Sequence, residues 1–106
     1  MSGVNPWRGE VALVIDGERH VARLTLGALA ELEESLAEPS LVALVERFEG
    51  NRFTSRDVLT LLAAGLRGGR APVSAAQLAQ GEIEGGPMVA ARVAAELLAR
   101  AFTEPG

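Results

Sequence analysis

The sequence predicts an α+β domain, mostly α-helical, in which an N-terminal β-hairpin is followed by about five helices in a compact bundle. Three patterns support this fold class. Near the N-terminus, apolar residues alternate with other residues on both sides of an Asp-Gly pair, as in a β-hairpin. Farther along, signals for the start of a helix recur, each followed by apolar residues at helical spacing. The last such segment, from Met88 to Phe102, carries only three charged residues, which is typical of a buried helix.

The length and composition of the chain limit the classes of protein to which it can belong. With 106 residues the chain has the length of one domain, and 48% hydrophobic residues are enough for a core. The absence of cysteine excludes disulfides and cysteine-based metal sites. The net charge of −4 argues against a primary nucleic-acid-binding protein, which would present a basic surface. No apolar run approaches the roughly 18 residues of a membrane span, and no signal peptide is visible, so we expect a cytoplasmic protein without a membrane partner.

The hairpin is predicted from Glu10–Ile15 and Arg19–Leu24, which flank a turn at Asp16-Gly17. A lone hairpin is marginally stable in water, so it must pack on the helices, and its free edge is available to a strand from a neighbouring molecule. Alternate residues of the two strands are expected to share one face: Val11, Leu13, Ile15, His20, Ala22 and Leu24.

The domain is expected to cover residues 10–102. Residues 1–9 are predicted to form a flexible arm and residues 103–106 a disordered C-terminus. Trp7 lies in the arm, and its large apolar ring is expected to dock either on the protein's own core or on a partner.

The stretch Leu24–Phe48 predicts two helices in tandem, interrupted at Pro39-Ser40. Thr25 is placed to cap the first helix, and Gly50 is a natural left-handed stop for the second. The apolar residues at helical spacing are Leu26, Leu29, Leu32 and Leu36 in the first helix, and Leu41, Leu44, Val45 and Phe48 in the second.

Two further helices begin with the same capping device. Thr54 and Asp57 are predicted to form a capping box at the start of the third helix, and Ser74 and Gln77 repeat it at the start of the fourth. Gly65 lies inside the third helix at a cost of about 1 kcal/mol relative to alanine. Either a close contact with another element or early termination of the helix would explain it.

No group of residues predicts catalysis, a cofactor or a metal site. His20 has no partner of its own kind and is interpreted as a half-buried strand residue. Glu82 and Glu84 are interpreted as a solvated pair in a glycine-bounded loop. The glycines after the third helix, beside Arg67 and Arg70, follow a helix rather than precede one, so we interpret them as a helix end and not as an anion site.

The helices do predict a protein-binding surface. The last helix is so apolar that it is either the central core helix or partly faces another subunit. Glu33 falls among the apolar residues of the first helix, where a carboxylate requires a partner such as Arg23, Arg47 or Arg56, unless the apolar stripe is narrower and Glu33 lies at its wet edge. The candidate protein-binding residues are therefore Met88, Val89, Val93, Leu97, Phe102 and Glu33.

Three segments carry a family resemblance that extends from Asn5 to Phe102. They are NPWRGEVALVIDGERHVARLTLGALAELEESL, SLVALVERFEGNRFTSRDVLTLLAAGLRGG and the alanine-rich last helix. The most specific string is RGEV followed by a hairpin and then LTLGALAELE. On these segments the chain resembles the small tail-morphogenesis proteins of gene transfer agents, the phage-like particles that some α-proteobacteria make.

The resemblance implies a non-enzymatic role in building the particle's tail. The family has been labelled as a tail tube protein, but its size and helical content are similar to those of a tail assembly chaperone, which coats the tape-measure protein while the tube polymerises. The expected partners are therefore the tape-measure protein, other tail proteins and further copies of this chain. Two alternatives stay open: a structural tube component retained in the particle, and a small helical regulatory or nucleic-acid-binding domain, against which the acidic charge counts.

Overall fold

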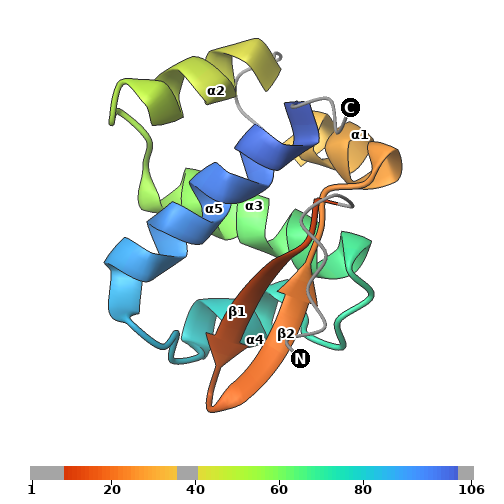
Figure 1. Cartoon of the computed structure of the whole chain (residues 1–106), viewed down its shortest axis with the longest axis vertical. Helices are drawn as coiled ribbons and strands as arrows, with labels where there is room; N and C mark the ends of the chain where they lie inside the picture. Colours follow the sequence, from red (N-terminus) through yellow and green to blue (C-terminus); the bar gives the residue numbers. More distant parts are fainter. Residues whose placement is uncertain (1–8, 36–40, 103–106) are drawn as a thin grey trace.

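A computed structural model describes residues 9–35 and 41–102, and the predictions for Trp7, for most of the N-terminal arm and for residues 103–106 lie outside this part. The described part contains a two-stranded antiparallel hairpin and five helices, which confirms the predicted fold class (Figure 1). In chain order the elements are β1 (Val11–Ile15), β2 (Glu18–Ala22), α1 (Leu26–Ser35), α2 (Leu41–Glu49), α3 (Ser55–Gly68), α4 (Ala75–Gln80) and α5 (Gly86–Phe102).

The hairpin forms as its sequence predicts. Asp16 and Gly17 have φ angles of 52° and 82°, the left-handed pair of a two-residue hairpin turn. The register pairs Leu13 with His20 and Val11 with Ala22, so the predicted apolar face is confirmed. This face lies against α5 and α3, and the β1 residues on it are buried.

Helix α3 lies at the centre and packs against α1, α4, α5 and β2 (Figure 1). Gly65 permits this close packing, because a Cβ atom there would lie 2.8 Å from Leu97 Cδ1. The Gly65 carbonyl also accepts a hydrogen bond from the backbone N–H of Arg23, at 2.8 Å. Of the two explanations offered for this glycine, close contact is the correct one.

The left-handed residues that end α2 and α3 are not the glycines. After α2 the positive φ of 56° belongs to Asn51, which corrects the prediction of a left-handed Gly50. After α3 it belongs to Arg70, at 61°. Gly68 and Gly69 serve a different purpose: a Cβ atom on either would collide with a backbone carbonyl at the end of β2.

The core is a single cluster between the hairpin and the helices. Its largest fully buried side chains are leucines of five different helices. None of the described helices has the length and apolar character needed to cross a membrane. The fully buried leucines are Leu32, Leu44, Leu61, Leu62, Leu66, Leu78 and Leu97.

Candidate protein-binding groove

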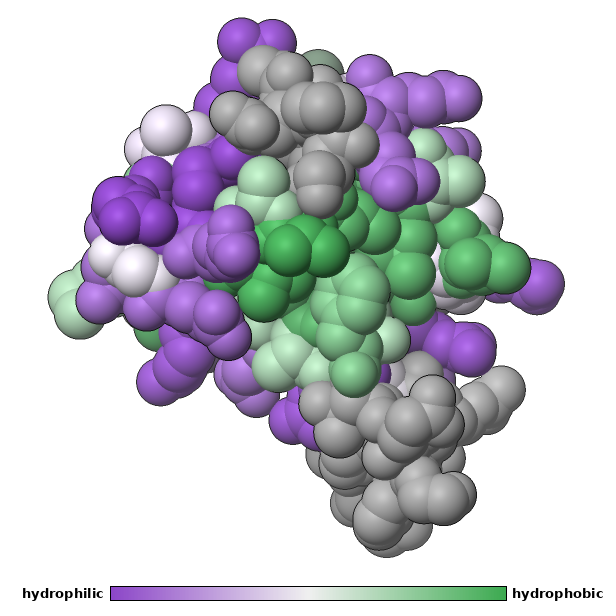
Figure 2. All heavy atoms as spheres, turned by 90° about the horizontal axis from the view of Figure 1, so that it is seen from above, coloured by the Kyte–Doolittle hydropathy of each residue, from purple (hydrophilic) through white to green (hydrophobic). Residues whose placement is uncertain are grey.

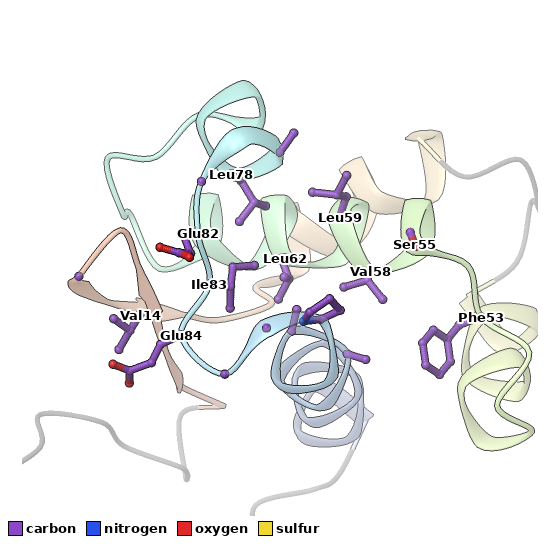
Figure 3. A pocket seen from close by; sticks show the side chains of 18 residues that line it. Val14, Phe53, Ser55, Val58, Leu59, Leu62, Leu78, Glu82, Ile83 and Glu84 are labelled. Carbon is purple, nitrogen blue, oxygen red and sulfur yellow. The ribbon is translucent and has the colours of Figure 1, made fainter.

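An open groove of about 920 Å³ lies between the first half of α3, α4, the loop that follows α4, and the start of α5 (Figure 3). All of the residues that line it belong to the described part of the chain. They are Val14, Gly17, Phe53, Ser55, Val58, Leu59, Leu62, Leu78, Ala79, Gly81, Glu82, Ile83, Glu84, Gly85, Gly86, Pro87, Ala90 and Ala91.

The middle of the groove is apolar. Leu59, Leu62, Leu78 and Ile83 come from three different segments and point toward the same space (Figure 3). On α3 the lining residues follow one face of the helix, at the spacing i, i+3, i+4, i+7 from Ser55. Leu59 keeps 37% of its surface exposed although Leu62, one turn later, is fully buried. The groove is therefore a depression in the surface of the domain, in which apolar side chains next to the core are accessible to solvent.

One wall of the groove is a loop fastened to the hairpin. Ile83 forms a bridge with Ile15, and the Glu84 N–H donates to the Val14 carbonyl at 3.0 Å. The Asp16 N–H donates to the Glu82 carbonyl at 2.8 Å, and the Asp16 carboxylate accepts from the Glu82 N–H at 2.8 Å. The edge of β1 that we expected to be free is therefore partly occupied by the chain itself.

The end of the groove beside the hairpin is acidic. Glu82 and Glu84 line this end, and both side chains are exposed. Asp16 and Glu18, in and beside the hairpin turn, are exposed as well, and Arg19, opposite Val14 in the hairpin, is an exposed base beside these four acids. The backbone bonds hold the loop in place, so the main chain that carries Glu82 and Glu84 has a fixed position relative to the apolar middle.

The opposite end of the groove is formed by Phe53, which stacks on Phe48 of α2 at a ring distance of 4.6 Å. Beside this stack, Arg47 Nε and Nη2 donate to the two carboxylate oxygens of Asp57, at 3.1 and 3.0 Å. Asp57 also accepts from the Thr54 N–H at 2.9 Å, and its own N–H donates to Thr54 Oγ1, which confirms the predicted capping box. Together these contacts fix the corner between α2 and α3.

The electrostatics of Asp57 follow from these contacts. Its side chain is buried, and burial raises the pKa of a carboxyl group. The hydrogen bonds from Arg47 and Thr54 and the positive charge of Arg47 outweigh this effect, so the pKa of Asp57 lies below its ordinary value. Asp57 is thus ionised, and Arg47 compensates its charge.

The residues predicted on α5 do not form one surface. Val93 and Leu97 belong to the core, with 4% and 1% of their surface exposed. Val89 is half-buried, whereas Met88 and Phe102 are 85% and 53% exposed. Met88 and Phe102 lie at opposite ends of α5, about 21 Å apart along the helix axis. Of the two interpretations of this helix, the central core helix describes most of its length.

Glu33 is exposed, so of the two interpretations offered for it, the narrower apolar stripe with Glu33 outside it is the correct one. The buried residues of α1 are Ala28 and Leu32, a narrower stripe than the sequence indicated. Arg47, one of its three expected partners, instead binds Asp57. The acidic face of α1 does meet a base within the chain, since Glu31 pairs with Arg67 at 2.9 Å.

A second apolar area lies at the other side of the molecule. Figure 2 shows it in the middle of the face viewed from the α2 side, between polar side chains. Val42 on α2 and Phe102 at the end of α5 are exposed apolar residues of helices that reach this side. Among the described residues, no group of three or more metal-binding side chains comes together at either place or elsewhere.

Comparison with known proteins places the chain in a family. The family model described as "Phage tail tube protein, GTA-gp10" matches residues 8–104. The chain belongs to this family. Searches of curated proteins and of solved structures found no match. The resemblance to gene transfer agent tail proteins is thereby confirmed, and the family description supports a tail-related role.

Proposed function

We propose that this gene transfer agent tail protein is a non-enzymatic assembly chaperone that binds the tape-measure protein and other tail components while the tail tube forms. The observation that carries the proposal is the open apolar groove of about 920 Å³ between α3, α4 and the start of α5. A chaperone must cover apolar segments of its client before the tube encloses them. An accessible apolar hollow on an acidic, charged protein suits that task.

The second candidate is a tube subunit that stays in the particle. The family description favours it, because it names a tail tube protein. Tube subunits are mostly built from β-sheets, however, and the described part of this chain has a single two-stranded sheet. A two-stranded hairpin with a partly occupied edge offers little for the continuous sheet of a tube.

Co-purification tests the chaperone proposal. The tagged full-length chain is co-expressed in bacteria with the tape-measure protein of the same particle, and the complex is measured by pull-down and light scattering. We expect a complex that keeps the tape-measure protein in solution. A chain that neither binds the tape-measure protein nor self-associates contradicts the proposal.

A further inference from the structure

We propose that the groove binds a helical segment of a partner tail protein that is apolar along one face and carries arginine or lysine at the end lying beside Glu82 and Glu84. This inference rests on the proposed function and adds the chemistry of the client segment. It follows from the two properties of the groove: an apolar middle and an acidic end whose main chain has a fixed position.

The apolar middle of the groove determines the apolar face of the client segment. Leu59 and Ile83 stand on opposite walls of the hollow and are both partly accessible (Figure 3). Side chains of leucine or methionine size, one helical turn apart on a client, would replace water over this surface. A volume of about 920 Å³ has room for several such side chains.

The acidic end of the groove determines the charge that the client segment carries at that end. The backbone groups of Glu82 and Glu84 are bonded to the hairpin, while their carboxylates remain exposed at the rim. Asp16 and Glu18 add negative charge beside them. A basic residue of the client would meet several carboxylates carried by a fixed backbone, whereas an acidic residue would be repelled.

Charge also favours a different protein over a second copy of this chain. The net charge of the chain is −4, so a second copy would on balance bring further negative charge to an end that is already acidic. A basic client segment reduces this charge when it binds. The occupant is therefore assigned to another tail protein.

Binding of overlapping peptides tests the inference. Fluorescently labelled peptides from the tape-measure protein and the major tail protein of the same particle are titrated with the full-length chain. We expect the bound peptides to combine apolar residues at helical spacing with arginine or lysine at one end. Replacing that basic residue by glutamate is expected to weaken binding about tenfold.

Groove variants locate the site. The double variant Glu82→Gln/Glu84→Gln should weaken binding about three- to tenfold and remove most of its dependence on salt concentration. Leu59→Asp should weaken it at least about tenfold, because it places a carboxylate in the apolar middle. The matched control, Glu34→Gln/Glu49→Gln, neutralises two exposed carboxylates on α1 and α2 and should leave binding unchanged. Circular dichroism confirms that each variant is folded.

The outcomes separate the inference from the proposed function. If the full-length tail partners bind but the groove variants bind as the wild type does, the inference is wrong and the chaperone proposal stands. If groove variants abolish self-association instead, a second copy occupies the groove, and the inference is also wrong. If neither tail partner binds at all, both the inference and the proposed function fail.

Discussion

At the scale of single residues, Asp57 connects two helices and the loop between them. Its carboxylate accepts hydrogen bonds from Arg47 on α2 and from the Thr54 N–H at the start of α3. With 8% of its surface exposed, it is a buried charge whose cost of desolvation depends on these partners. This carboxylate therefore contributes to the position of α2 and of Phe53 at the end of the groove, together with the Phe48–Phe53 stack.

Removing the carboxylate should show this dependence. Asp57→Ala removes both the ion pair with the half-buried Arg47 and the capping box, so we expect a loss of about 3 kcal/mol in the free energy of unfolding. Urea denaturation followed by circular dichroism measures it. Glu46→Ala on the exposed face of α2 is the control and should change stability by less than about 0.5 kcal/mol. Equal effects for the two variants would contradict the account of the α2–α3 corner.

The same carboxylate predicts a dependence on pH. Because the pKa of Asp57 is lower in the folded than in the unfolded chain, its contribution is fully present above the unfolded pKa of about 4 and is lost as the pH falls through the folded pKa. The difference in unfolding free energy between wild type and Asp57→Asn should stay constant from about pH 7 to pH 5 and shrink below about pH 4. Urea unfolding at a series of pH values measures this difference. A difference that grows on acidification would show that the pKa is raised instead.

At the scale of elements, the end of α3 is shaped by the strand that it touches. A Cβ atom on Gly68 would collide with the carbonyl group of Arg23, which belongs to the backbone and cannot rotate away. Gly27 on α1 is the matched contrast, since a Cβ atom there would meet only Thr25 Oγ1, at 3.9 Å. Both glycines lie in helices, so a difference in the effect of alanine at the two positions reports on the contact between Gly68 and Arg23, directly after β2.

Alanine substitutions test this contrast. Gly68→Ala should destabilise the protein by at least about 2 kcal/mol, because α3 and β2 would have to move apart. Gly27→Ala should stabilise it by up to about 1 kcal/mol, because alanine is the better helix former. Thermal and urea unfolding of the two variants give both values. If Gly68→Ala were as stable as Gly27→Ala, the close packing of α3 on the hairpin would be refuted.

Sequence patterns that involve only a few consecutive residues predicted the helices and the hairpin well. The capping boxes at Thr54 and Ser74 form as predicted, because such a box depends on a few consecutive residues. The Asp16-Gly17 turn forms for the same reason. The left-handed residue after α2 was predicted one position too early, at Gly50 instead of Asn51. The contacts that require Gly68 and Gly69 are with the end of the hairpin, which the local sequence does not show. Helical periodicity likewise gave the direction of the α1 stripe but not its width, so the sequence left two interpretations of Glu33 open.

The groove could not be predicted from the sequence, because it depends on contacts between distant residues. Its loop wall is attached by bonds such as that between Asp16 and Glu82, which are 66 residues apart. One signal was present: Ile83 between two glutamates is a short alternating pattern, typical of a strand at a sheet edge. Treating Glu82 and Glu84 only as a solvated pair missed the bridge that this pattern forms with β1.

At the scale of the whole molecule, the described part of the chain is a small helical domain with one core and an open groove beside it. Its fully buried leucines come from all five helices, while the groove exposes apolar side chains beside an acidic rim. A tube subunit retained in a particle would need surfaces that pair permanently with its neighbours. A chaperone needs an accessible surface that binds its client reversibly, and we propose that the groove is this surface.

Quantitative mass spectrometry of purified particles, compared with assembling tails from the producer cells, tests the chaperone account most directly. The account predicts that this protein is abundant in the assembling tails and absent from finished particles, or present at a small fraction of the amount of the major tail protein. A constant ratio to the major tail protein in finished particles would contradict the account and identify the chain as a structural subunit of the tail.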